Sequence, residues 1–233
     1  MMRAIYDRDE KWYGPLDRIF LEYPLHRAVY DRLQILTGKI EAELEMRLRA
    51  GREVRIFTAP GGFAYDLFRP LEAIAAPLPE LMGQMEVVAT DLDPHGVLAG
   101  ELAERAKKLG IRFGFLRGDM TDDAMRRRFA ERAPYDMVLF IGLSAWLPKP
   151  GVLNHLRWLR KNLRGDGVLV TDSFTPEAYA LSGRYVGYKA NYYEPEVFRT
   201  LVDYCGFDGL GADVESGRDG INHVLIASPR TRG

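Results

Sequence analysis

The apolar positions between residues 25 and 48 follow a helical period. They recur every three or four residues, at Leu25, Val29, Leu33, Leu36, Ile40, Leu44 and Leu48. This spacing predicts one long helix with a single apolar stripe, and Gly51 is suited to end it. The charged residues between these positions, including Asp31, Arg32 and Arg47, are expected to form its solvated face.

From Glu53 onward, short apolar runs alternate with helical patterns. The runs predict strands at residues 54–58, 86–90, 111–116, 135–141 and 168–171. Because helical patterns separate them, we expect a doubly wound, mostly parallel sheet of the α/β class. A last helix is predicted at 195–204. Two short runs, at 209–214 and 221–227, flank a glycine-containing turn and predict a terminal hairpin that adds an antiparallel strand, giving seven strands in all.

The chain is therefore expected to have two parts of different organisation. Residues 1–50 are expected to form an N-terminal helical cap segment, and residues 51–233 the domain that holds the sheet. A chain of 233 residues is long enough for one such domain with a full core.

Composition excludes several classes of protein. The net charge is −1, with acids and bases interspersed, which makes a dedicated nucleic-acid-binding role unfavourable. The single cysteine, Cys205, rules out an internal disulfide and a cysteine-rich metal site, and the four histidines share no ligand spacing, so no metal is expected. No apolar run approaches the roughly 20 residues of a membrane helix, and residues 1–14 lack the apolar core of a secretory signal. The expectation is a cytoplasmic protein without a membrane partner.

The candidate chemistry lies at the predicted carboxyl ends of the strands, where doubly wound sheets bind ligands. Strand one leads into Ala59-Pro60-Gly61-Gly62 and then a helix, an arrangement that offers backbone N–H groups to a nucleotide-like ligand. Asp91 ends strand two and can accept from both hydroxyls of a ribose. Asp119 follows strand three and can accept from an adenine amino group. Each acid taken alone is also explained as a helix cap or a solvated loop residue.

Taken together, these motifs are more specific. TAPGG follows strand one, VVATDLDP covers strand two, LRGDM follows strand three, YDMVLFIGL covers strand four and LRGDGVLV leads into strand five. In this order they resemble the class I S-adenosylmethionine-dependent methyltransferases, which have a Rossmann-like fold. The resemblance covers the chain from about Glu53 onward and implies that residues 51–233 are a Rossmann-like methyltransferase domain.

The resemblance also implies a cofactor site for S-adenosyl-L-methionine. The turn of Ala59, Pro60, Gly61 and Gly62 would pack against the methionine part. Asp91 would bind the ribose and Leu92 would flank the adenine. Asp119 with Met120 would hold the adenine edge. Ile141 and Gly142 would lie near the sulfonium and the methyl acceptor.

The first motif departs from the family pattern. The family usually carries an acid near Phe57 and glycines near Ala59 and Phe63. Because Phe57 cannot receive the cofactor's amino group, another residue, a water or a backbone carbonyl must do so. Some RNA methyltransferases have an APGG turn, but they need an acid at the end of strand four and a catalytic lysine, and FIGLSAWL at that position has no acid. An NAD-binding protein would need Gly-x-Gly-x-x-Gly, which APGGFA does not match.

The sequence thus predicts transfer of a methyl group to an O or N nucleophile of a small molecule. The sulfonium is already a good leaving group, so alignment and desolvation can suffice. The sequence leaves open whether a general base acts, and no catalytic residue is singled out. Two alternatives stay open: a regulatory protein that binds the cofactor without turnover, and an RNA methyltransferase. The oligomeric state is not readable, with a homodimer among the options.

Two aromatic-rich segments, residues 1–50 and 174–193, lie outside the cofactor pattern. They are predicted to cap the acceptor pocket, together with the loop after strand four. The side chains predicted to contact the acceptor are Tyr13, Tyr23, Trp146, Tyr188 and Tyr192. The alternative is that these aromatics only hold the N-terminal helix against the domain.

Overall fold

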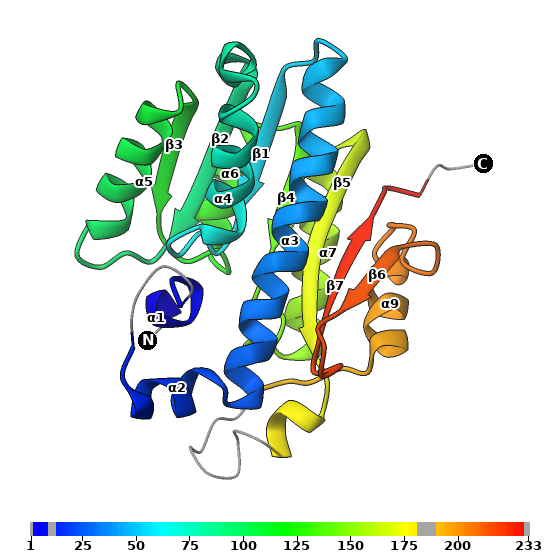
Figure 1. The fold of residues 1–233 in the computed structure, drawn as a ribbon. Coiled ribbons are helices and arrows are strands. Elements are labelled where there is room, and N and C mark those ends of the chain that lie inside the picture. Colours follow the sequence, from blue (N-terminus) through cyan, green and yellow to red (C-terminus); the bar gives the residue numbers. More distant parts are fainter. Residues whose placement is uncertain (1, 9–12, 181–189, 231–233) are drawn as a thin grey trace.

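A seven-stranded sheet forms the centre of the computed structural model, which describes residues 2–8, 13–180 and 190–230 (Figure 1). The strand order is β3-β2-β1-β4-β5-β7-β6. The first five strands run parallel, β7 is antiparallel to β5, and β6 is antiparallel to β7. The strands are β1 (Val54–Thr58), β2 (Met85–Asp91), β3 (Arg112–Arg117), β4 (Tyr135–Phe140), β5 (Leu163–Phe174), β6 (Asp213–Ser216) and β7 (Asn222–Ala227). The predicted fold class is confirmed.

Helices cover both faces of this sheet (Figure 1). One face carries α3 (Pro24–Arg49), α4 (Tyr65–Ala75) and α5 (Val97–Lys108), with the short 3-10 helix η1 (Pro79–Gln84) before β2. The other face carries α6 (Asp123–Ala130), α7 (Lys149–Asn162) and α9 (Pro195–Tyr204). The central strands β1 and β4 are buried almost throughout, as expected of parallel strands covered on two sides. Among the described residues, no helix combines the length and apolarity needed to cross a bilayer.

The long helix α3 is present as predicted, and its apolar stripe packs into the front core with Leu36, Ile40 and Leu44 fully buried. The prediction of a fully solvated charged face was wrong. Arg32 and Arg47 are each only 5% exposed. Both arginines lie three residues after an apolar stripe position and so fall on the buried side of the helix. Asp31, predicted on the same solvated face, is buried as well.

The first helices of the chain lie at the carboxyl end of the parallel strands. Helices α1 (Met2–Tyr6) and α2 (Pro15–Leu21) are beyond the carboxyl ends of the parallel strands, whereas α3 belongs to the front layer (Figure 1). Ile5, Tyr6 and Leu21 are buried in a cluster with Val29 and Leu33 of α3. The segment is therefore packed at the edge of the sheet where doubly wound folds generally bind ligands.

Strand β5 is longer than predicted, because it begins at Leu163 and ends at Phe174 rather than spanning 168–171. Its early residues pair with β4 across an irregularity, with Leu163 opposite Tyr135. Its extension at the other end brings Asp172 to the carboxyl edge. Of the segment 174–193, residues 181–189 lie outside the described residues.

Candidate functional site

The turn after β1 is bound tightly to the end of β2. The N–H of Gly61 donates to the carbonyl of Thr90 at 2.6 Å, and the N–H of Gly62 donates to Oδ2 of Asp91 at 2.8 Å. A Cβ at position 61 would stand 3.2 Å from that carbonyl oxygen, and Gly62 has φ of +47°. Glycine at both positions therefore allows an approach and a backbone conformation that larger residues would hinder.

Asp91 joins the ends of three strands. Its side chain holds the turn after β1, and its carbonyl accepts from the N–H of Gly118, just after β3, at 3.0 Å. The next residue, Leu92, is 62% exposed. An exposed leucine beside a carboxylate at a strand end suits a ligand that is flat and apolar on its face and polar at its rim, as a nucleoside is.

Asp119 is oriented by its neighbour Thr121. Its Oδ1 accepts from the N–H and from the hydroxyl of Thr121, both at 2.8 Å. These hydrogen bonds hold the pKa of the Asp119 carboxyl below its ordinary value. Asp122, not Asp119, caps α6, by accepting from the N–H of Ala124. The side chain of Met120 is buried in the rear core, which lies between the sheet and helices α6, α7 and α9, so only its backbone is available to a ligand at this edge.

A buried polar network lies beyond β4, where the methyl group is expected. Gly142, with φ of +72°, donates its N–H to Oδ1 of Asp172 at 2.6 Å, and Ile141 beside it is buried. Asp172 also accepts from Nη1 of Arg32 at 2.9 Å and from Nδ2 of Asn222 at 3.0 Å. The other terminal nitrogen of Arg32 donates to the hydroxyl of Tyr6 at 2.8 Å.

Two charged side chains at this network keep an unsatisfied atom. Within the described residues, Nε of Arg32 and Oδ1 of Asp66 are buried without a hydrogen-bond partner. Asp66 lies in the first turn of α4, directly after the glycine turn. Its burial raises the pKa of its carboxyl, which the positive charge of Arg32 partly opposes.

Sequence reasoning missed Asp66, Arg32 and Asp172. Two of them carried a readable signal. Asp172 is an acid at the carboxyl end of strand five, the same signal that singled out Asp91. Arg32 is a charge placed on an apolar stripe, which implies a buried partner.

The residues predicted to contact the acceptor fall in separate places. Tyr13 donates to the carbonyl of Ala4 at 3.3 Å, and the ring of Tyr23 lies 5.5 Å from that of His26. Tyr192 packs beside a cluster of Ala28, Ala178 and Ile221. Trp146 is 55% exposed in the loop after β4, and Tyr188 lies outside the described residues. Their role at an acceptor stays a prediction.

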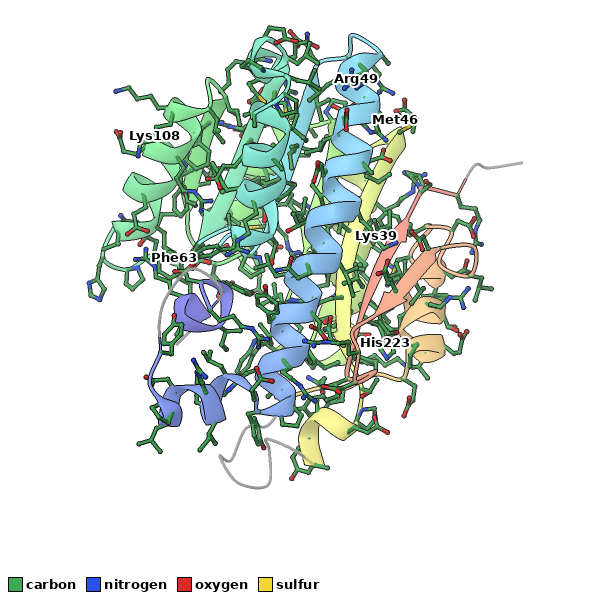
Figure 2. All side chains as sticks on the ribbon, viewed as in Figure 1. Lys39, Met46, Arg49, Phe63, Lys108 and His223 are labelled. Carbon is green, nitrogen blue, oxygen red and sulfur yellow. The ribbon has the colours of Figure 1, made fainter. Side chains whose placement is uncertain are left out.

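A groove of about 750 Å³ lies beside the predicted cofactor edge, between α1, α4 and α5. Phe63 lies at its end next to α1, and Lys108 lies on α5 at some distance from it (Figure 2). Its lining mixes four basic and four acidic side chains: Arg3, Arg69, Arg105, Lys108, Asp7, Glu72, Glu101 and Glu104. This balance selects no charged class of ligand.

The fold is that of the class I S-adenosylmethionine-dependent methyltransferases. No family model matches the chain, and no curated protein is detectably similar to it in sequence. Solved structures are similar in fold. Magnesium protoporphyrin IX methyltransferase from Synechocystis PCC 6803, with bound S-adenosylhomocysteine, has a TM-score of 0.65 and 15% identity, covering 98% of this chain and 92% of that one.

Two further structures extend the likeness. A possible exported protein from Bordetella parapertussis has a TM-score of 0.71 and 19% identity, covering 98% of this chain and 78% of that chain. An O-methyltransferase family protein from Burkholderia thailandensis has a TM-score of 0.62 and 14% identity, covering 99% of this chain and 64% of that one. At these identities the likeness is one of fold.

Proposed function

We propose that this protein is a methyltransferase that uses S-adenosyl-L-methionine and acts on an O or N nucleophile of a small molecule. One observation carries the proposal. The glycine turn is hydrogen-bonded to Asp91, beside the exposed Leu92, at the carboxyl edge of a sheet with the methyltransferase strand order. The donors, acceptors and apolar surface there fit the parts of this cofactor.

The predicted acids and Leu92 bind different parts of the cofactor. Gly62 uses one acceptor position of the Asp91 carboxylate, and the remaining positions accept from the ribose hydroxyls. Leu92 contacts the adenine face. Asp119 accepts from the adenine amino group, with its carboxylate oriented by Thr121. When bound, the cofactor supplies a methyl group on a positively charged sulfur. The protein then has to align the acceptor with this group and exclude water.

The acceptor is proposed to approach beside Ile141 and Gly142, at the end of β4. The near-neutral net charge favours a small molecule over a nucleic acid. The similar structures include a magnesium protoporphyrin IX methyltransferase and an O-methyltransferase family protein, which supports a small acceptor and an oxygen nucleophile. We propose a cytoplasmic setting, which suits the unpaired Cys205, and cell fractionation tests it.

Isothermal titration calorimetry with S-adenosylhomocysteine tests the first half of the proposal. We expect saturable binding at one site per chain, and the absence of binding would contradict the proposed function. Transfer of a labelled methyl group in a screen of small hydroxyl and amine compounds tests the second half. Binding without transfer to any of these compounds would favour the regulatory alternative.

A further inference from the structure

Arg32 and Asp66 are opposite charges that each keep one buried, unsatisfied polar atom. Arg32 is 5% exposed, and its terminal nitrogens are used by Asp172 and Tyr6, which leaves the Nε–H without an acceptor. Oδ1 of Asp66 has no donor. Buried polar atoms in native proteins are nearly always satisfied, so an unsatisfied donor and acceptor in one network indicate a missing partner. That partner must itself carry an acceptor and a donor.

Asp66 and Arg32 belong to the two places that the proposed function assigns to the ends of the cofactor's methionine part, the glycine turn and the end of β4. Asp66 follows the glycine turn by four residues, and helical side chains lean toward the helix N-terminus, which here is that turn. Arg32 stands beside the end of β4, since a Cβ built on Gly142 would be 3.6 Å from its Nη1. The charge of Asp66 raises the pKa of Arg32, and the charge of Arg32 partly opposes the rise in the pKa of Asp66, so the two side chains belong to one cluster. The amino-acid end of S-adenosylmethionine, by the proposed function, lies between this turn and Gly142.

We propose that Asp66 and Arg32 recognise the amino-acid end of the cofactor. Oδ1 of Asp66 accepts from its ammonium group, and Nε of Arg32 donates to its carboxylate. The inference rests on the proposed function and adds which residues of this chain select the zwitterion.

The proposal accounts for the absence of an acid at position 57. Phe57 is fully buried and points into the rear core, where its ring lies 4.2 Å from that of Phe129 and 5.3 Å from that of Tyr135. The usual position of the ammonium-binding acid therefore serves packing in this chain. Asp66 supplies a carboxylate from α4 at the same turn.

The test compares two nucleosides by calorimetry. S-adenosylhomocysteine has the amino-acid end, and 5′-methylthioadenosine lacks it. We expect the wild-type protein to bind the first at least about tenfold more tightly. Asp66→Asn keeps the side-chain shape and removes the charge. It should weaken binding of S-adenosylhomocysteine about tenfold or more, with binding of 5′-methylthioadenosine changed less than about twofold.

A second variant and a control keep the outcomes distinct. Arg32→Lys retains a cation beside Asp172 but removes the Nε donor, and it should show the same selective loss. Glu72→Gln makes the same charge change on an exposed site of α4, where Glu72 pairs with Arg105, and should leave both affinities unchanged. Equal weakening of both nucleosides by Asp66→Asn, or no weakening, overturns this inference alone. If the wild type binds neither nucleoside, the proposed function fails as well.

Discussion

Asp91 has two tasks at the end of β2: it holds the N–H of Gly62 and, by our proposal, the ribose. Charge-assisted hydrogen bonds of this kind are worth roughly 1.5–3 kcal/mol. Asp91→Ala should therefore weaken binding of S-adenosylhomocysteine about tenfold or more. Calorimetry measures this, with Asp123→Ala, an exposed acid of α6, as the control that keeps wild-type affinity. Unchanged affinity in Asp91→Ala would remove this carboxylate from the site.

By our proposal, Asp119 distinguishes adenine from hypoxanthine, because its carboxylate accepts from an amino group and has nothing to give to a carbonyl. The wild type should therefore prefer the adenosine form of the cofactor product over the inosine form by about tenfold or more. Asp119→Ala should bind both alike, as competition calorimetry can show. Thr121→Val keeps the carboxylate and loses only the hydroxyl contact, so most of the preference should remain. If Asp119→Ala keeps the full preference, Asp119 is a turn residue only.

Single residues could be predicted from the sequence where their own motif identifies them. The glycine turn and Asp91 each end a predicted strand, and the two strand ends meet at the carboxyl edge of the sheet. Asp66 could not be assigned in the same way. Its neighbours along the chain predict a helix start, and its role depends on Arg32, which comes from another element. The environment of Phe57, a rear aromatic cluster, likewise depends on helices that follow much later.

Most helices and parallel strands were predictable, because apolar residues at helical spacing mark the helices and continuous apolar runs mark the buried strands. The start of β5 was not. Gly165-Asp166-Gly167 is a typical turn sequence, yet these residues continue the strand, because β4 and β5 pair across a register shift between Tyr135 and Met137. Pairing with a neighbouring strand overrides the local turn preference. The same extension carries Asp172 to the edge.

The buried histidine of α7 makes stability depend on pH. His155 is fully buried, its ring is stacked on Phe140 at 4.6 Å, and burial lowers its pKa to about 3. The unfolded chain takes up a proton near pH 6.5, so the stabilisation is complete above that pH and is lost as pH falls toward 3. At pH 5, protonation of this histidine in the unfolded chain should have lowered the free energy of unfolding by about 2 kcal/mol.

Urea unfolding of the wild type and of His155→Leu at pH 7.5 and pH 5 measures this contribution. The variant should lose about 2 kcal/mol less between the two pH values than the wild type loses. His26→Leu is the matched control, because His26 lies on the surface side of α3, and it should keep the wild-type pH dependence. Equal pH dependence in the wild type and His155→Leu would show that His155 is not the source.

Over the whole molecule, the site is assembled from segments that the chain order keeps apart. The network at the carboxyl edge joins Tyr6 of α1, Arg32 of α3, Asp172 of β5 and Asn222 of β7. Arg32 and Asp172 are separated by 140 residues, and Asp172 and Asn222 by 50. No single stretch of sequence holds this signal. It appears only once α3 lies across the sheet and the hairpin returns beside β5.

The N-terminal segment should matter for methyl transfer more than for cofactor binding. Residues 1–23 precede α3, and their helices lie beyond the carboxyl edge, whereas the glycine turn, Asp91 and Asp119 belong to the sheet domain (Figure 1). Deleting residues 1–23 exposes Val29 and Leu33 but leaves both main cores intact. We expect a folded protein that still binds S-adenosylhomocysteine, weakened by less than about tenfold through the loss of the Tyr6 contact to Arg32.

Transfer by the truncated protein should collapse, because the open edge no longer excludes water or holds the acceptor in line. Calorimetry and labelled methyl transfer to the acceptor found in the screen measure the two effects. Tyr6→Phe is the matched variant: it keeps the apolar packing of α1 and loses only the hydroxyl contact to Arg32, so it should bind the cofactor product as the truncation does but retain transfer. Full transfer by the folded truncation would show that α1 and α2 are no part of the acceptor site, and the acceptor would then have to be held by the loop that carries Trp146 and by the segment after β5.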